Sequence, residues 1–140
     1  MVMRTQVTFD CADPHSQAAF WAQVFGTVVE DHSALVDRLV AEGRIPAEDR
    51  VEVGGRSAFR DVAACADPQG VEPRLFFQRV PEGKLVKNRV HLDIDVEEER
   101  KLAEVDRLTG LGARLVATAA DRGPIAYVMQ DPEGNEFCLH

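Results

Sequence analysis

Two segments far apart in the chain alternate polar and apolar residues. The first, "RTQVTFDC", covers residues 4–11, and the second, "RVHLDIDV", covers residues 89–96. A period of two is typical of a strand with one buried face, because successive side chains point to opposite sides. We therefore expect a strand in each segment, with its polar residues on one face and its apolar residues against helices.

A helical pattern follows each of these strands. Asp13 is a favourable N-cap and Pro14 a favourable first residue for a helix predicted over Asp13–Phe25, and Gly26 ends it. A second helix is predicted over Glu97–Thr109, where acidic residues in the first turn suit the helix dipole. The residues of this second helix expected to face inward are Leu102, Val105 and Leu108.

The turn Asp-Pro-x-Gly occurs twice, at residues 67–70 and 131–134, each time between two strand-like segments. Strand-like pieces also cover Val51–Val53 and Ser57–Ala64, after a helical stretch over Asp31–Gly43 that ends at a glycine. We interpret Asp67 and Asp131 as turn formers, because Asp side chains accept hydrogen bonds from the backbone that follows.

The spacing of these features indicates a duplication with one insertion. Asp13 and Asp67 are 54 residues apart, whereas Glu98 and Asp131 are 33 apart, and the difference of 21 matches the length of residues 31–50. Without that segment both halves read strand, helix, strand, strand, strand. The sequence predicts an α+β fold of two βαβββ modules with mainly antiparallel sheets, about residues 1–83 with a helical insertion at about 31–50, and about residues 84–140.

Composition and charge limit the classes of function. The 140 residues are 45% hydrophobic, enough for one globular domain, and carry 16 basic and 24 acidic residues for a net charge of −8. Such a surface repels phosphate backbones and anionic lipids, and no apolar run reaches the length of a membrane span, so we expect no nucleic acid or membrane partner. Three cysteines without a C-x-x-C pair and a start that lacks signal-peptide features favour a cytoplasmic protein with free thiols.

Several motifs together resemble the glyoxalase-like branch of the vicinal oxygen chelate superfamily, which includes glyoxalase I, bleomycin-resistance proteins, fosfomycin-resistance enzymes and extradiol dioxygenases. They are "DPHSQAAFW", "FFQRVPEGKLVKNRVHLDIDV", "LGA" and "DPEGNEFCL". The resemblance covers nearly the whole chain. It implies one domain of residues 1–140 whose paired modules form a cup-shaped sheet around a small-molecule site, often within a homodimer.

The resemblance also implies where a divalent metal would bind. The first-strand ligand position of the family falls on Gln6 in one module and on His91 in the other. The last-strand position, about seven residues after the turn Asp, falls on Cys138, while the acid Glu136 lies two residues earlier on the same face. We predict Gln6, His91 and Glu136 as ligands of Zn, Ni, Fe or Mn, and Glu136 also as a catalytic proton-transfer group. The residues predicted to line the ligand site are Thr8, Gln78, Asp93 and Cys138.

Each of these residues also has a structural interpretation. His91 could be an interior histidine paired with Asp93, Gln6 a polar wall residue, and Cys138 a small buried hydrophobe. Glu136 could orient its turn or pair with Arg89. These alternatives stay open from the sequence.

The function implied is that of a small-molecule protein, either a metal-dependent lyase, isomerase or dioxygenase, or a binding protein that sequesters a drug or metabolite without chemistry. The incomplete set of carboxylates favours the second class, whereas the polar faces of the two first strands favour the first. A third alternative is a regulator whose cup docks a partner. No G-x-S-x-G, G-x-x-x-x-G-K-[ST] or G-x-G-x-x-G motif is present, so acyl-serine chemistry, nucleotide hydrolysis and dinucleotide binding lack support.

Overall fold

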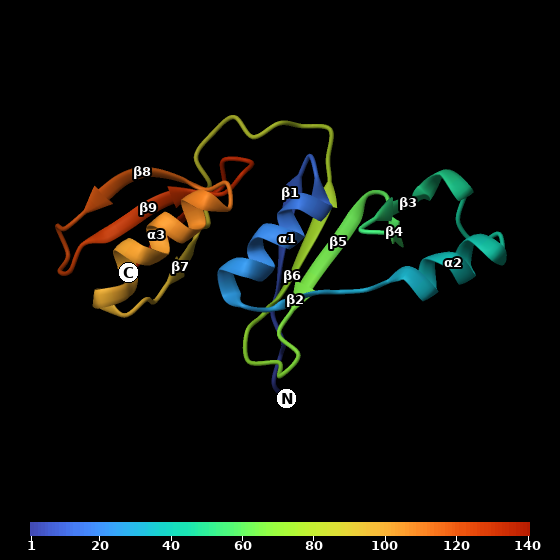
Figure 1. Ribbon diagram of the computed structural model, residues 1–140, viewed down its shortest axis with the longest axis horizontal. Helices are drawn as coiled ribbons and strands as arrows, with labels where there is room; N and C mark the ends of the chain where they lie inside the picture. The colour runs from blue at the N-terminus through green and yellow to red at the C-terminus, as the bar shows by residue number, and fades with distance from the viewer. The chain divides into compact units, whose positions relative to one another are not determined.

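The computed structural model describes residues 1–140, which form two compact units, Met1–Gly83 and Lys84–His140. Each unit has its own sheet and its own helix packed on that sheet (Figure 1). None of the helices is both long enough and apolar enough to cross a lipid bilayer.

The first unit contains a four-stranded sheet in the order β1-β6-β5-β2. Strand β1 (Gln6–Cys11) is parallel to β6 (Arg74–Arg79), and β5 (Val62–Ala66) is antiparallel to both β6 and β2 (Val28–Val29). The second unit repeats this arrangement in the order β7-β10-β9-β8. Strand β7 (Leu92–Ile94) is parallel to β10 (Glu136–Leu139), and β9 (Ala126–Gln130) is antiparallel to both β10 and β8 (Arg114–Ala119).

The matching strand orders confirm the predicted α+β fold of two βαβββ modules. In both units the first strand pairs in parallel with the last, and every other pairing within the four-stranded sheets is antiparallel. Strand β2 has only two residues, which is too short for a periodic pattern to reveal.

Helix α1 (Pro14–Phe25) begins and ends where its capping residues predict. Asp13 accepts hydrogen bonds from the backbone N–H groups of His15 and Ser16, both at 3.2 Å. Gly26 adopts φ +66°, a left-handed conformation that glycine tolerates best, and closes the helix. The helix contacts β5 and β6, and the ring of Trp21 lies 5.2 Å from that of Phe9.

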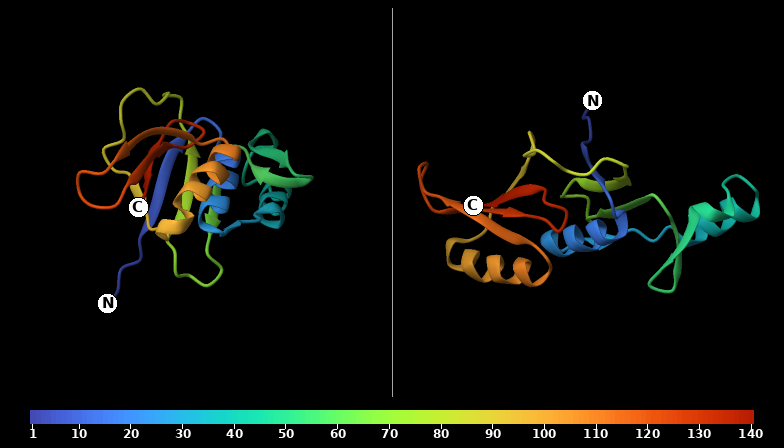
Figure 2. Two further views of the ribbon diagram at one scale, coloured as in Figure 1. Left: turned by 60° about the vertical axis from the view of Figure 1, so that its left-hand side comes forward. Right: turned by 90° about the horizontal axis from the view of Figure 1, so that it is seen from above.

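Helix α3 (Lys101–Gly110) covers one face of the second sheet (Figure 2, right), and a short 3-10 turn, Glu98–Arg100, precedes it. The expectation that Leu102 faces inward is wrong, because its side chain is 65% exposed. Lys101, Val105 and Leu108 are the buried residues of this helix. Their spacing of four and three places them on one face, and the Lys101 ammonium donates to Glu98 at 2.6 Å and to the backbone oxygen of Ile125 at 3.2 Å.

The insertion in the first unit contains the expected helix, α2 (Ser33–Ala41), followed by a short 3-10 turn, Ala47–Asp49. A hairpin of β3 (Arg50–Val53) and β4 (Arg56–Phe59) then forms a separate two-stranded sheet. Helix α2 contacts this hairpin, and the two elements lie together beyond the four-stranded sheet (Figure 1). The strand-like segment predicted over Ser57–Ala64 is thus two strands, β4 and β5, interrupted at Arg60 and Asp61.

Both Asp-Pro-x-Gly turns are built as expected. The carboxylate of Asp67 accepts hydrogen bonds from the backbone N–H groups of Gln69 and Val71, and that of Asp131 accepts from those of Glu133 and Asn135. Each turn leads toward the last strand of its module, so it sets the position at which that strand begins.

Candidate metal centre

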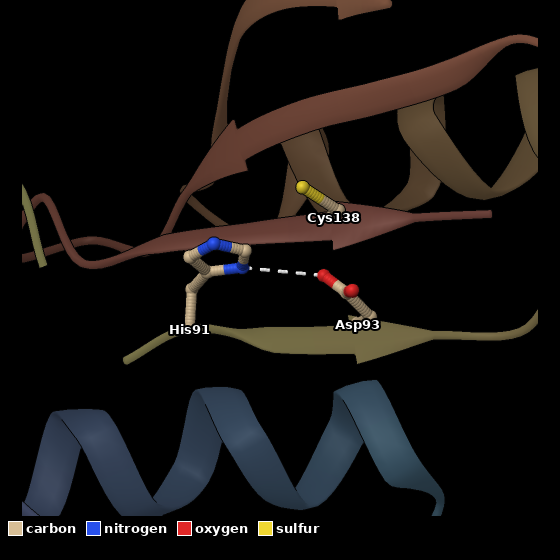
Figure 3. Close-up of side chains that lie close together, drawn as sticks. All are labelled: His91, Asp93 and Cys138. Atoms are coloured by element: carbon tan, nitrogen blue, oxygen red, sulfur yellow. Dashed lines mark hydrogen bonds and ion pairs between the residues drawn. The ribbon is translucent and has the colours of Figure 1, made fainter. Parts of the chain in front are cut away.

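Strands β7 and β10 bring three candidate metal ligands together in the second unit. The two strands are parallel neighbours, and Asp93 lies opposite Cys138. His91, two residues before Asp93, points to the same face of the sheet (Figure 3). One donor atom from each of His91, Asp93 and Cys138 lies within 4.8 Å of the other two. We call these three residues the metal cluster.

A second histidine borders the metal cluster. The Nδ1 atom of His91 lies 3.2 Å from Oδ1 of Asp93, and Nε2 of His140 lies 3.4 Å from the other oxygen, Oδ2. The backbone of His140 is held by two hydrogen bonds, one donated to Ile94 and one accepted from Val96. One carboxylate therefore lies between two imidazoles.

The metal cluster lines a pocket of about 380 Å³ formed by the second unit alone. Val128 and Ala126 supply apolar wall, and the loop that joins β8 to β9 contributes Asp121 and Arg122. Lys101 also lines the pocket, with a side chain only 5% exposed. A pocket of this size and mixed polarity suits a small molecule with both apolar and charged groups.

The surroundings of Cys138 favour the protonated thiol in the absence of an ion. Partial burial raises the pKa of Cys138, and the negative charge of Asp93 raises it further, against a smaller opposing effect of Lys87. A metal ion would have to displace this proton, as metals do when they bind cysteine.

Glu136 is held by other groups and does not belong to the metal cluster. Its carboxylate accepts hydrogen bonds from the backbone N–H of Asn88 at 2.9 Å, the Lys84 ammonium at 3.1 Å and the Gln130 amide at 3.3 Å. Burial works to raise the pKa of Glu136, but these hydrogen bonds outweigh it and lower the pKa to about 2. The basic partner of Glu136 is thus Lys84, where the sequence suggested Arg89.

The remaining predicted site residues lie in the first unit. The amide oxygen of Gln6 accepts a hydrogen bond from Arg74 at 2.7 Å, and Gln78 donates to Asp10 at 2.8 Å. Thr8 is exposed on β1, opposite Phe76 of β6. The expectation that Gln6 and His91 bind the same ion concerns both units and stays a prediction.

A divalent ion fits the metal cluster. Metal–ligand bonds of about 2.0–2.3 Å place the donors around a tetrahedral ion roughly 3–4 Å apart, so rotations of side chains already within 4.8 Å of one another would suffice. Imidazole, carboxylate and thiolate are all established ligands of first-row metals. When bound, such an ion would supply Lewis acidity to an oxygen of a ligand in the adjoining pocket.

Two residues of this site were not assigned from the sequence. Residues two apart on a strand share a face, so the sequence alone could have placed His140 on the same face as Glu136 and Cys138. Lys101 lies four residues before Val105 and seven before Leu108, and that helical spacing could have placed it on the buried face. A lysine in such a position is easily taken for a surface residue, because lysines are rarely buried.

Comparison with known proteins identifies the family of this chain. The sequence pattern of the glyoxalase-like domain matches residues 6–140, so the chain belongs to the glyoxalase-like domain family. No protein of curated function matches the chain.

Several solved structures resemble the fold over nearly the whole chain. The fosfomycin resistance protein FosX from Listeria monocytogenes, in complex with Mn(II) and 1S,2S-dihydroxypropylphosphonic acid, is 11% identical, with a TM-score of 0.61 over 100% of this chain and 90% of that one. A glyoxalase/bleomycin resistance protein/dioxygenase family enzyme from Burkholderia phytofirmans is 19% identical, with a TM-score of 0.62 over 96% of this chain and 94% of that one. FosX from Mesorhizobium loti is 11% identical, with a TM-score of 0.62 over 100% and 91%. At these identities the likeness shows the fold.

Proposed function

We propose that this protein binds a small, oxygen-bearing molecule next to a divalent ion held by the metal cluster. The observation that carries the proposal is the meeting of three donor side chains at the wall of the 380 Å³ pocket. The ion would polarise neighbouring oxygens of the ligand, the chemistry shared by metal-dependent lyases, isomerases and dioxygenases. The FosX relatives support a divalent ion, since one is complexed with Mn(II).

One exposed cation at the pocket supports a ligand with an acidic group. Arg122 lines the pocket with a side chain that is 93% exposed and only loosely paired, 3.6 Å from Asp121, whereas the other lining cation, Lys101, is already paired with Glu98. The phosphonate that accompanies Mn(II) in the Listeria relative is a ligand of this kind, so fosfomycin and simple phosphonates belong in a ligand screen.

Sequestration of a ligand without chemistry is the second candidate, and the state of Glu136 favours it. A general base works best with a pKa near the working pH, whereas Glu136 has a pKa of about 2 and three hydrogen-bond donors. If Glu136 has only a structural role, Asp93 is the carboxylate of the metal cluster that lines the pocket. Turnover of a bound ligand by wild type, and its loss in Asp93→Asn, would distinguish an enzyme from a binding protein.

The central experiment is calorimetry with Zn, Ni, Mn and Fe(II), using protein purified without a metal-affinity tag. We expect saturable binding of one ion per chain, and at least a tenfold loss of affinity in His91→Ala, because imidazole is a principal donor. His32→Ala is the matched control, since His32 is a half-buried histidine of the first unit that pairs with Glu30. Absence of saturable binding, or equal binding by wild type and His91→Ala, would contradict the proposal and leave metal-free ligand binding as the better account.

Two other expectations accompany this proposal. A homodimer and a cytoplasmic setting are both predictions at this point, and the sequence-based alternative that Gln6 adds a ligand from the first unit is open to test. The three cysteines form no disulfide, which suits a reducing compartment.

A further inference from the structure

We propose that the ion is of the zinc type, held by the Cys138 thiolate, the His91 imidazole, the Asp93 carboxylate and, as a fourth ligand, the His140 imidazole. This rests on the proposed function, because it assumes that an ion binds at the metal cluster. All four ligands come from β7, β10 and the residues next to them. Binding releases the thiol proton of Cys138 to solvent.

The donor set argues for the identity of the ion. Two imidazoles, one thiolate and one carboxylate are the nitrogen, sulfur and oxygen ligands that zinc takes in tetrahedral sites. Zinc can also expand to five ligands, so an oxygen of a molecule in the pocket can add to this set. Manganese and magnesium instead favour oxygen-rich sites, and Asp93 is the only oxygen donor in this set. The residues therefore favour an ion softer than the Mn(II) found in the Listeria relative.

His140 is placed to complete this set. Its backbone hydrogen bonds to Ile94 and Val96 fix where its side chain starts, and alternation along the strand puts it on the face of Cys138. Its Nε2 atom already lies 3.4 Å from Asp93, and the side chain is 46% exposed, so it has room to turn toward an ion. It also lines the same pocket as the metal cluster.

The duplication provides an internal comparison. Gln6 and His91 hold matching places in the two first strands, so Thr8 corresponds to Asp93, and Phe76, which lies opposite Thr8, corresponds to Cys138. The first unit thus has a hydroxyl and a phenyl ring where the second has a carboxylate and a thiol. Strong donors occur at these positions in one module only, which is why we assign the whole ligand set to residues 84–140.

Cobalt(II) is a suitable probe, because it takes zinc sites and a thiolate bound to it gives an intense charge-transfer band in the near ultraviolet. We expect this band on titration of wild type, its removal by added Zn, and its persistence with added Mn. Cys138→Ser should lack the band, whereas Cys65→Ala, which removes a buried thiol of the first unit, should retain it.

The preference for zinc is tested by exchanging the donor. Zinc binds more tightly than manganese at almost any site, so the ratio of affinities matters more than their order. Cys138→Asp keeps the number of ligands but replaces sulfur by oxygen, and it should lower the Zn/Mn affinity ratio at least about tenfold. Cobalt binding without the thiolate band, or an unchanged ratio in Cys138→Asp, would overturn the assignment of Cys138.

The roles of His140 and Gln6 are tested by the same titration. His140→Ala should lower zinc affinity at least about tenfold, change the visible cobalt spectrum because a nitrogen ligand is lost, and recover with added imidazole. Gln6→Ala should leave zinc affinity within about twofold. An unchanged cobalt spectrum in His140→Ala would overturn its assignment as a ligand, and a large loss in Gln6→Ala would show that the site needs both units.

These outcomes separate two kinds of failure. If no ion binds, the proposed function fails together with this inference. If an ion binds and His91→Ala removes it, but the thiolate band is missing, the proposed function stands and only the zinc-type assignment fails. Thermal melting of each variant without metal checks that the fold is retained.

Discussion

Glu136 and Cys138 lie two residues apart on the same face of one strand, yet their surroundings give them different roles. Glu136 has a side chain only 10% exposed, with three donors directed at its carboxylate. Cys138 lies opposite Asp93, and a neighbouring negative charge disfavours its ionised form. The Glu136 carboxylate is therefore stabilised as an anion and fixes the residues before β7. The ionised form of the Cys138 thiol, in contrast, would be stabilised by an added cation.

A pH-dependent contribution to stability is expected from Glu136. Its pKa is about 2 in the folded protein, compared with about 4.3 in an unfolded chain, so its stabilising effect is complete above about pH 4.3 and is lost as the pH falls toward 2. Glu136→Gln should lower the free energy of unfolding at pH 7 by about 1–3 kcal/mol. Urea denaturation of both proteins between pH 7 and pH 3 should show this difference shrinking on acidification.

The control for this prediction is Glu52→Gln, which removes one charge from an exposed position on β3. It should change stability by less than about 0.5 kcal/mol at either pH. A difference between wild type and Glu136→Gln that stays the same at pH 3 as at pH 7 would show that the ionised carboxylate is not the stabilising form.

In helix α3 the first buried residue was predicted one position away from its true place. Leu102 is apolar and was expected to face inward, whereas the packing places Lys101 there. Lysine can occupy such a position because its methylene groups pack like an apolar chain and its ammonium reaches polar partners at the end of the helix. Both partners are present here, Glu98 and the backbone oxygen of Ile125.

This arrangement predicts that two adjacent substitutions differ strongly. Lys101→Ala removes buried methylene groups and two hydrogen bonds, and should lower the free energy of unfolding by about 1–3 kcal/mol. Leu102→Ala is the matched control, because that side chain is 65% exposed, and should cost less than about 0.5 kcal/mol. Chemical denaturation of both variants decides the point, and a larger effect in Leu102→Ala would contradict the observed helix phase.

How well the sequence predicts each element depends on how far apart in the chain the interacting residues lie. Helix α1, the Asp67 and Asp131 turns and the alternating strands depend on nearby residues, so their patterns are visible in the sequence. The metal cluster depends on the register of β7 against β10, two strands more than 40 residues apart. Sequence reasoning named its three members, but separated His91 as a ligand from Asp93 and Cys138 as lining residues, because the register was not known.

The β3–β4 hairpin shows a second limit. Its strands have four residues each and form a sheet of their own, whereas β4 was predicted to continue into β5 as a single strand from Ser57 to Ala64. The break falls at Arg60 and Asp61, where no glycine or proline marks it. The Arg60 guanidinium instead pairs with the carboxylates of Asp49 and Asp61, and such a polar network cannot be recognised from hydrophobic spacing.

Over the chain as a whole, one topology carries two different surfaces. The matching face of the first unit has Gln6 and Glu30 hydrogen-bonded to Arg74, and the Arg74 guanidinium lies 5.4 Å from the centre of the Phe76 ring. The second unit has histidine, aspartate and cysteine at positions related by the duplication. Because the shared fold depends on the opposite, buried faces of the strands, the polar faces were free to diverge.

Association into a homodimer is expected from the apolar residues that both sheets leave exposed. Strand β8 is an edge strand in which Leu115 is 43% and Val116 50% exposed, and in the first unit Val28 of edge strand β2 is 55% exposed. The register shift at Val116 disfavours backbone pairing along β8, so we expect contact through side chains.

Light scattering at micromolar concentration should report a dimer, and Val116→Glu should weaken it at least about tenfold, because burying an unpaired carboxylate is costly. Leu85→Glu, at a position 95% exposed and outside any strand, is the matched control and should leave the dimer intact. A monomeric wild type would contradict the prediction. Equal weakening of the dimer by both variants would indicate a general effect of charge instead of an interface at β8.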